Sequence, residues 1–167
     1  MTTFIEYFAK VFNGNTLAII GAALAVILPG IGSARGVNLV ARATAGLISE
    51  DPNKYGKSML LQALPMTQGI YGMVTAFLIM LFGNVMGAEL SFADGAYYLF
   101  AAMPIAFGGL YSAIRQGEVA AAGVSVLAKR PDAVGKAVIS ASFVELYAIL
   151  GLLISLLLIL MKTVALA

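Results

Sequence analysis

The sequence predicts an all-α membrane protein in which four transmembrane helices form two tandem hairpins. Hydrophobic residues make up 61% of the 167 residues and charged residues only 11%, whereas soluble domains are about 25% charged. The mean hydropathy is +0.97. Charges leave four long apolar stretches, and the two halves of the chain repeat one another. We therefore expect a single membrane domain over 1–167, surrounded by lipid, and the net charge of +2 does not indicate a nucleic-acid partner.

Each apolar stretch is about as long as, or longer than, the roughly 20 residues that cross a bilayer. The stretches 11–34, 58–88 and 95–114 contain no charged residue, and 137–161 contains one, Glu145. They are joined by a polar turn (49–57), an acidic connection (83–94) and a second polar turn (129–136). This pattern predicts four helices with short connections and leaves no room for a soluble domain.

The charges of the connections predict the orientation in the cell membrane. The two polar turns contain the basic residues Lys54, Lys57, Lys129, Arg130 and Lys136, whereas the middle connection contains Glu89 and Asp94 and no basic residue. Because basic connections stay in the cytoplasm, we expect both polar turns there and both termini on the outer side.

The chain aligns with itself without a gap at an offset of 79 residues. The matched positions include Gly30, Ser33, Ala34, Val40, Pro52, Gly56 and Lys57, which fall on Gly109, Ser112, Ala113, Val119, Pro131, Gly135 and Lys136. Such self-similarity indicates a duplicated unit. We therefore expect two hairpins, 11–88 and 89–167. Both turns contain the matched proline on the same side of the membrane, which predicts parallel repeats.

The helices differ in side-chain size. Small residues recur at every fourth position of the third helix, and the first helix has a GxxxG pair; both patterns favour close helix packing. These residues are Gly109, Ala113, Gly117, Ala121 and Ser125, and Gly32 and Gly36. The last helix is bulky (LLISLLLIL). The small residues could pack the helices of one monomer, but the contrast favours a ring of copies with small-residue helices inside and bulky helices outside.

Glu145 is a candidate functional residue because an ionised carboxylate within a membrane span costs at least ~2.5 kcal/mol. Alternatively, a protonated Glu145 could simply join helices by a hydrogen bond. In the predicted hairpin, Gln116 and Glu145 lie 15 and 14 residues from Pro131, so both should lie at one depth. The 79-residue offset carries Glu145 back to Met66, next to Thr67 and Gln68.

Several oxygen atoms are thus predicted at the depth of one carboxylate. A dehydrated monovalent cation needs several oxygens, whereas a proton needs only the carboxyl, so the set favours Na+ over H+. Pro65 has no amide N–H, and nearby backbone carbonyls, including that of Leu64, could add ligands. Tyr71 and Tyr147 could donate hydrogen bonds to Glu145. No organic cofactor is indicated.

Three segments resemble a known family: LPMTQGIYG (64–72), AIRQGEVAAAGVSVLAKRP (113–131) and VELYAILG (144–151). They are similar to the duplicated, four-helix membrane rotor subunit of V-type ATPases, also called the proteolipid, c or K subunit, and most similar to its Na+-translocating bacterial members. The resemblance implies a ring of identical subunits, driven by a separate soluble ATPase head through a central stalk. It implies these ion ligands: Glu145, Thr67, Gln68, Gln116 and the backbone carbonyl of Leu64, with Tyr71 bonded to the carboxylate.

Arg115 departs from this pattern, because it places a cation next to Gln116. Successive helical residues are about 100° apart, so Arg115 should point away from the Gln116 side chain and extend toward lipid headgroups.

The predicted mechanism is a rotor in which Glu145 takes an ion from a neighbouring stator protein, carries it through lipid and releases it to a second channel. The chain lacks a GxxxxGK[ST] loop, so it is predicted not to hydrolyse ATP itself. The turns 49–57 and 129–136 are candidate contacts for the stalk. The alternatives are a small four-helix antiporter that exports cationic compounds in exchange for protons, and a structural proteolipid or pore.

Overall fold

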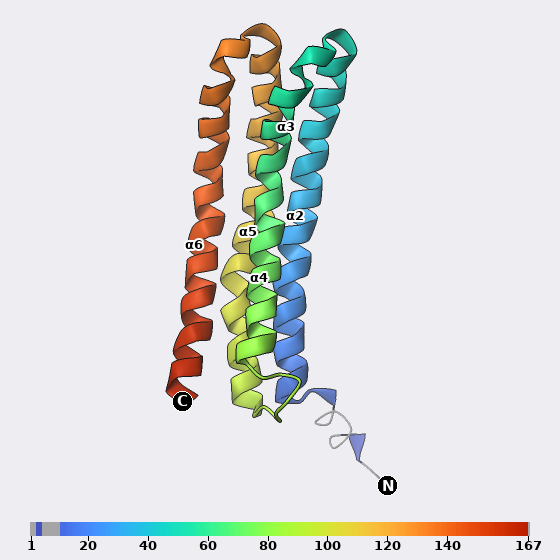
Figure 1. Cartoon of the computed structure of the whole chain (residues 1–167). Coiled ribbons are helices and arrows are strands. Elements are labelled where there is room, and N and C mark those ends of the chain that lie inside the picture. The colour runs from blue at the N-terminus through green and yellow to red at the C-terminus, as the bar shows by residue number, and fades with distance from the viewer. Residues whose placement is uncertain (1–2, 5–10, 167) are drawn as a thin grey trace.

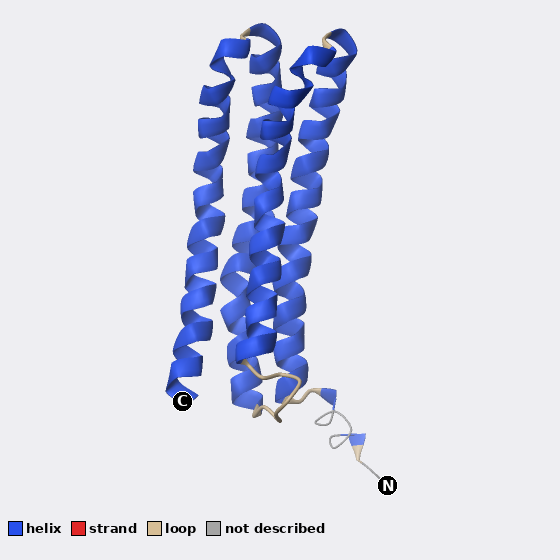
Figure 2. Cartoon of the chain, viewed as in Figure 1, coloured by secondary structure: helices blue, strands red, loops and turns tan. Residues whose placement is uncertain are grey.

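The computed structural model describes residues 3–4 and 11–166, and in this part the chain forms four long helical segments. These segments lie side by side (Figure 1). Helices and loops account for these residues, and no strand occurs among them (Figure 2). The elements are α2 (Gly14–Glu50), η1 (Pro52–Lys54), α3 (Tyr55–Ala63), η2 (Leu64–Met66), α4 (Thr67–Phe82), α5 (Phe92–Lys129), η3 (Pro131–Ala133) and α6 (Val134–Leu166).

Four helical segments are long and apolar enough to cross a membrane: Gly14–Glu50, Pro52–Phe82, Phe92–Lys129 and Pro131–Lys162. The turns that begin with Pro52 and Pro131 lie at one end of the bundle, and the connection between α4 and α5 lies at the other (Figure 1). The predicted all-α fold of two parallel hairpins is therefore confirmed. The N-terminal residues 1–2 and 5–10 and the last residue, 167, lie outside the described residues.

The helices differ in length from the charge-free stretches. Helix α2 continues through Arg35 and Arg42 and has 37 residues, which at 1.5 Å per residue is about 55 Å. The hydrocarbon core of a bilayer is only about 30 Å thick. A charged residue ends the apolar stretch but not the helix, because the backbone hydrogen bonds continue beyond the lipid. The second segment, Pro52–Phe82, has 31 residues, and it begins and ends six residues earlier than the predicted stretch 58–88, because α4 ends at Phe82.

The connection between α4 and α5 is held against the start of α2 by one side chain. The amide of Asn15 donates to the carbonyls of Val85 and Ala88, both at 2.7 Å, and its oxygen accepts from the N–H of Leu90 at 2.9 Å. Asn84 in this connection has a φ of 46°, a conformation that asparagine adopts more readily than most residues. The Asn15 side chain thus satisfies backbone groups of the connection that would otherwise bond to water.

Helices α2 and α5 make the most extensive contact in the bundle. Gly36 and Gly117 face each other so closely that a Cβ added to either would collide with the backbone of the other helix. The predicted small-residue contact is thus confirmed for Gly109, Ala113 and Gly117, which are buried. Ser125 is exposed, because a spacing of four residues turns about 40° further around the helix at each step.

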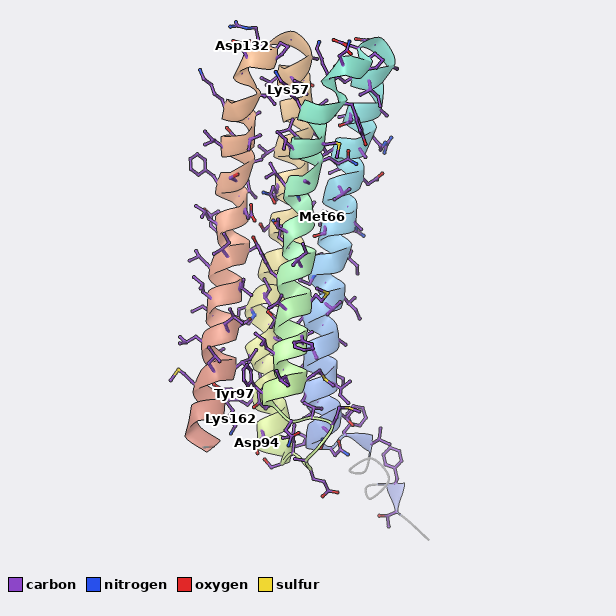
Figure 3. All side chains as sticks on the ribbon, in the orientation of Figure 1. Lys57, Met66, Asp94, Tyr97, Asp132 and Lys162 are labelled. Atoms are coloured by element: carbon purple, nitrogen blue, oxygen red, sulfur yellow. The ribbon has the colours of Figure 1, made fainter. Side chains whose placement is uncertain are left out.

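Helix α4 packs on both α2 and α5, whereas α6 packs mainly on α5. At the end opposite the turns, Lys162 of α6 pairs with Asp94 of α5 at 2.5 Å and lies 5.5 Å from the ring centre of Tyr97 (Figure 3). The hydroxyl of Tyr97 also donates to the carbonyl of Leu158 at 3.0 Å. These contacts fix the height of α6 against α5, and with it the height of Glu145.

Candidate functional site

Pro65 interrupts the second segment at the depth of the predicted site. It lies in the 3-10 turn η2, between α3 and α4, and is buried. The carbonyl of Leu64 accepts from the N–H of Thr67 and also from its hydroxyl, at 3.1 Å. Because the proline lacks an N–H, the local backbone departs from the α-helical pattern. The break places Thr67 and Gln68 in the first turn of α4.

Glu145 of α6 is partly buried and points toward α4 and α5. The hydroxyl of Tyr71 donates to Glu145 Oε1 at 2.6 Å, and the amide of Gln116 donates to Oε2 at 3.3 Å. Each carboxylate oxygen therefore has one donor, and the two donors come from different helices. Gln116 and Glu145 thus lie at the same depth, as the sequence predicts.

The two glutamines continue this network away from the carboxylate. Gln68 Nε2 donates to Gln116 Oε1 at 2.5 Å, and the Thr67 hydroxyl lies 3.4 Å from Gln68 Oε1. Both glutamine side chains are 0% exposed, so no solvent replaces these contacts. A continuous chain of polar groups thus runs from the Leu64 carbonyl to Glu145.

The structure therefore brings together all five predicted ligands. The first hairpin contributes Leu64, Thr67 and Gln68, and the second contributes Gln116 and Glu145. One carboxylate supplies one negative charge, which matches a monovalent cation or a proton. The amide, hydroxyl and carbonyl oxygens could coordinate a dehydrated cation without adding charge.

Ser112 is a member of the network that the sequence analysis did not identify as a site residue. Its hydroxyl donates to the carbonyl of Val144 at 2.9 Å and lies 3.4 Å from Gln68 Nε2. The side chain is 5% exposed. Its position four residues before Gln116, one turn away on the same face, is the signal that could have indicated it.

Of the two tyrosines predicted to bond the carboxylate, Tyr71 makes the hydrogen bond in the structure. Tyr147 is 71% exposed and lines a groove on the flank of α5 and α6, so its predicted role stays a prediction. Arg115 also lines this groove, and it pairs with Glu118 at 2.9 Å. The Arg115 side chain therefore points away from Gln116, as expected, and it pairs with the Glu118 carboxylate.

The basic turns also interact with each other. Lys54 donates to the carbonyl of Ala128 at 3.0 Å, and Lys57 donates to that of Pro131 at 3.3 Å. Lys57 and Asp132 are labelled at this end of the bundle in Figure 3. These bonds tie the turn of the first hairpin to that of the second, so the two candidate stalk contacts form one surface.

Comparison with known proteins supports the duplication. The family model that describes the C subunit of ATP synthase matches residues 20–79 and again residues 99–158. The two matched stretches are displaced by 79 residues, which is the offset found in the sequence. Each stretch covers most of one hairpin.

Two relatives extend over most of the chain. The V-type sodium ATPase subunit K of Enterococcus hirae is 47% identical over 93% of this chain and 98% of its own length. The A-type ATP synthase subunit K of Methanocaldococcus jannaschii is 39% identical over 85% of this chain and 61% of its own length. Both are named as subunits of ATPase or ATP synthase complexes, as predicted for this chain, and neither supports the antiporter alternative. The chain belongs to the family of the ATP synthase C subunits, in a form with two tandem copies of the family's hairpin.

Proposed function

We propose that this chain is a rotor subunit of a rotary V-type ATPase, and that it carries Na+ at Glu145 as a ring of identical copies turns against a stator. The observation that carries the proposal is the continuous hydrogen-bonded set of oxygen-bearing groups between the Leu64 carbonyl and the Glu145 carboxylate. The name of the Enterococcus hirae relative, a sodium ATPase subunit, supports Na+ as the ion.

The number of oxygens favours Na+ over H+. Proton transport needs one carboxyl group, whereas Na+ must replace its hydration shell by several protein oxygens. Gln68 and Gln116 are fully buried, and burying polar groups is costly unless each finds a partner. The side-chain oxygens of the two glutamines could also coordinate a cation, in addition to their hydrogen bonds to each other. H+ remains the alternative ion.

The charge of the site couples ion binding to rotation. With Na+ bound, the carboxylate is neutralised and the rotor can turn that site into lipid. Without a cation or a proton, Glu145 is an uncompensated anion that would cost several kcal/mol in hydrocarbon. Each copy therefore leaves the stator only when it is loaded. ATP hydrolysis takes place in the separate soluble head.

The joined turns are the proposed contact for the central stalk, on the cytoplasmic side. Asn53 is exposed in the first turn, and only its backbone N–H bonds to Asp51, so Asn53→Cys keeps the local structure. In oriented vesicles this thiol should react with an impermeant maleimide from the cytoplasmic side and become protected when the soluble head is attached. Reaction only from the outer side would reverse the proposed topology.

Labelling by a carbodiimide tests the ion directly, because the reagent attacks a protonated carboxyl group. We expect Na+ to slow the labelling of Glu145 in the purified complex, and K+ at the same ionic strength to serve as the control. The protection should weaken as the pH falls, since protons and Na+ compete for one carboxylate. If millimolar Na+ gave no protection near neutral pH, H+ would be the transported ion.

A further inference from the structure

The hydroxyl group of Ser112 lies between Gln68 and the helix that carries Glu145. Ser112 is only 5% exposed. Its Oγ is 2.9 Å from the carbonyl oxygen of Val144 and 3.4 Å from Gln68 Nε2. A carbonyl oxygen has no proton, so the contact with Val144 uses the single proton of the hydroxyl. Toward Gln68, Ser112 can therefore only accept a hydrogen bond.

This direction fixes which end of the Gln68 amide faces α5. An amide nitrogen donates hydrogen bonds, whereas an amide oxygen accepts them. Gln68 Nε2 meets two acceptors on α5, Ser112 Oγ and, at 2.5 Å, Gln116 Oε1. The Gln68 oxygen consequently faces the other way, 3.4 Å from the Thr67 hydroxyl. The reversed amide would place its oxygen against two acceptors at a buried position, where unpaired polar groups are costly.

The equivalent serine of the first hairpin also acts on Gln68. Ser33 is the counterpart of Ser112 in the 79-residue repeat. Its hydroxyl oxygen accepts the N–H of Gly69, the residue after Gln68, at 2.9 Å. Ser33 thus holds the backbone next to Gln68 from α2, while Ser112 holds the side chain from α5. The position of the Gln68 oxygen is set by two hydroxyl groups that are not themselves predicted ion ligands.

The two acceptors of Gln68 Nε2 differ in their other duties. Gln116 gives its oxygen to Gln68 and its N–H to Glu145. The proposed function assigns that same oxygen to Na+, and a cation repels the positive end of an N–H group. Na+ therefore competes with Gln68 for the Gln116 oxygen. The Ser112 hydroxyl has no such competing role, so it is the acceptor that stays with Gln68.

Taking the Na+ site of the proposed function as given, we infer that Ser112 is a positioning residue that contributes to selectivity for Na+. It accepts from Gln68 Nε2 and thereby holds Gln68 Oε1 on the side of Thr67 and the Leu64 carbonyl, the other proposed neutral ligands of the first hairpin. Ser112 does not contact the ion. A proton on Glu145 needs no further oxygen, so loss of the hydroxyl should weaken Na+ binding relative to H+ binding.

The variant Ser112→Ala tests this role by carbodiimide labelling of Glu145 in the purified complex. Removal of one hydrogen bond between neutral groups should raise the Na+ concentration for half-maximal protection by roughly 2- to 10-fold. Labelling without Na+ is the reference for each variant. An unchanged Na+ concentration for half-maximal protection would overturn the inference.

The matched control is Ser155→Ala, which removes another buried serine between the same two helices. Ser155 of α6 is 0% exposed, and its hydroxyl oxygen accepts the N–H of Ile105 of α5 at 3.2 Å. Ser155 is ten residues from Glu145, or about 15 Å along the helix. We expect no change in Na+ protection. A rise equal to that of Ser112→Ala would indicate loosened packing of α6 on α5 and would overturn the role of Ser112.

A double-mutant cycle shows whether Ser112 acts through Gln68. In a complex that already carries Gln68→Leu, adding Ser112→Ala should change Na+ protection little, because the group that Ser112 positions is gone. The same fold-change in both backgrounds would overturn the inference and leave the Na+ site standing. Absence of Na+ protection in the parent complex would instead overturn the proposed Na+ site, and the inference with it.

Discussion

The two hairpins have the same helical arrangement but differ at the position of the membrane carboxylate. The second hairpin has Glu145, and the first has Met66 at the equivalent position. The first hairpin instead contributes Thr67, Gln68 and Tyr71 to the surroundings of Glu145. One hairpin therefore carries the charge, and the other supplies neutral oxygens and a hydroxyl donor. Neither hairpin alone contains all five predicted ligands, and the fused chain brings them together.

Removal of the charge should have the largest effect. Glu145→Gln keeps the shape of the side chain, and we expect it to abolish ATP-driven Na+ uptake by vesicles that contain the complex, with unchanged assembly by native mass. Met66→Gln, which places the same amide at the equivalent position of the first hairpin, should leave uptake intact. Normal uptake by the Glu145→Gln complex would show that the carboxylate does not carry the ion.

Gln116→Leu tests whether the neutral oxygens bind the cation. Loss of one buried partner costs about 1–3 kcal/mol, so the Na+ concentration for half-maximal protection against the carbodiimide should rise roughly 5- to 150-fold. Labelling without Na+ should change little. Gln62→Leu, an amide outside the site, is the control. An equal loss of labelling with and without Na+ would indicate disrupted folding and not a missing ligand.

The two tyrosines give a sharper comparison. Tyr71→Phe removes the donor to Glu145, and a hydrogen bond to a charged group contributes about 1.5–3 kcal/mol. We expect part of this hydrogen-bond energy to be present only when Na+ is bound. The Na+ affinity of the Tyr71→Phe variant should therefore fall by roughly an order of magnitude. Tyr147→Phe should change it less, because this side chain is 71% exposed and lies in the groove on the flank of α5 and α6. An effect of the same size from both variants would contradict this division.

The smallest effect on ion affinity is expected from Gly36→Ala, which changes the packing of α2 on α5. The added Cβ would meet the Ala113 carbonyl and Pro65, and overpacking costs about 1–3 kcal/mol. The thermal midpoint of the detergent-solubilised complex should therefore fall. Gly46→Ala is the control, since nothing lies within 4 Å of its added Cβ, and it should not lower the midpoint.

The sequence by itself determined the four apolar helices, the duplication and the common depth of Gln116 and Glu145. These features follow from local quantities: the length of a charge-free stretch, the rise of a helix and the distance of each residue from the turn at Pro131. For the same reason, all five predicted ligands came together in the structure.

Only the tertiary structure showed that Tyr71 donates a hydrogen bond to Glu145 and that Ser112 joins the network. It also decided that Arg115 pairs with Glu118 on an exposed flank. Depth along a helix can be counted, but the rotation of α6 about its own axis depends on how its side chains pack on α5. That packing turns Glu145 toward Tyr71 and Gln116, and it leaves Tyr147, two residues further along the helix, on the outer surface.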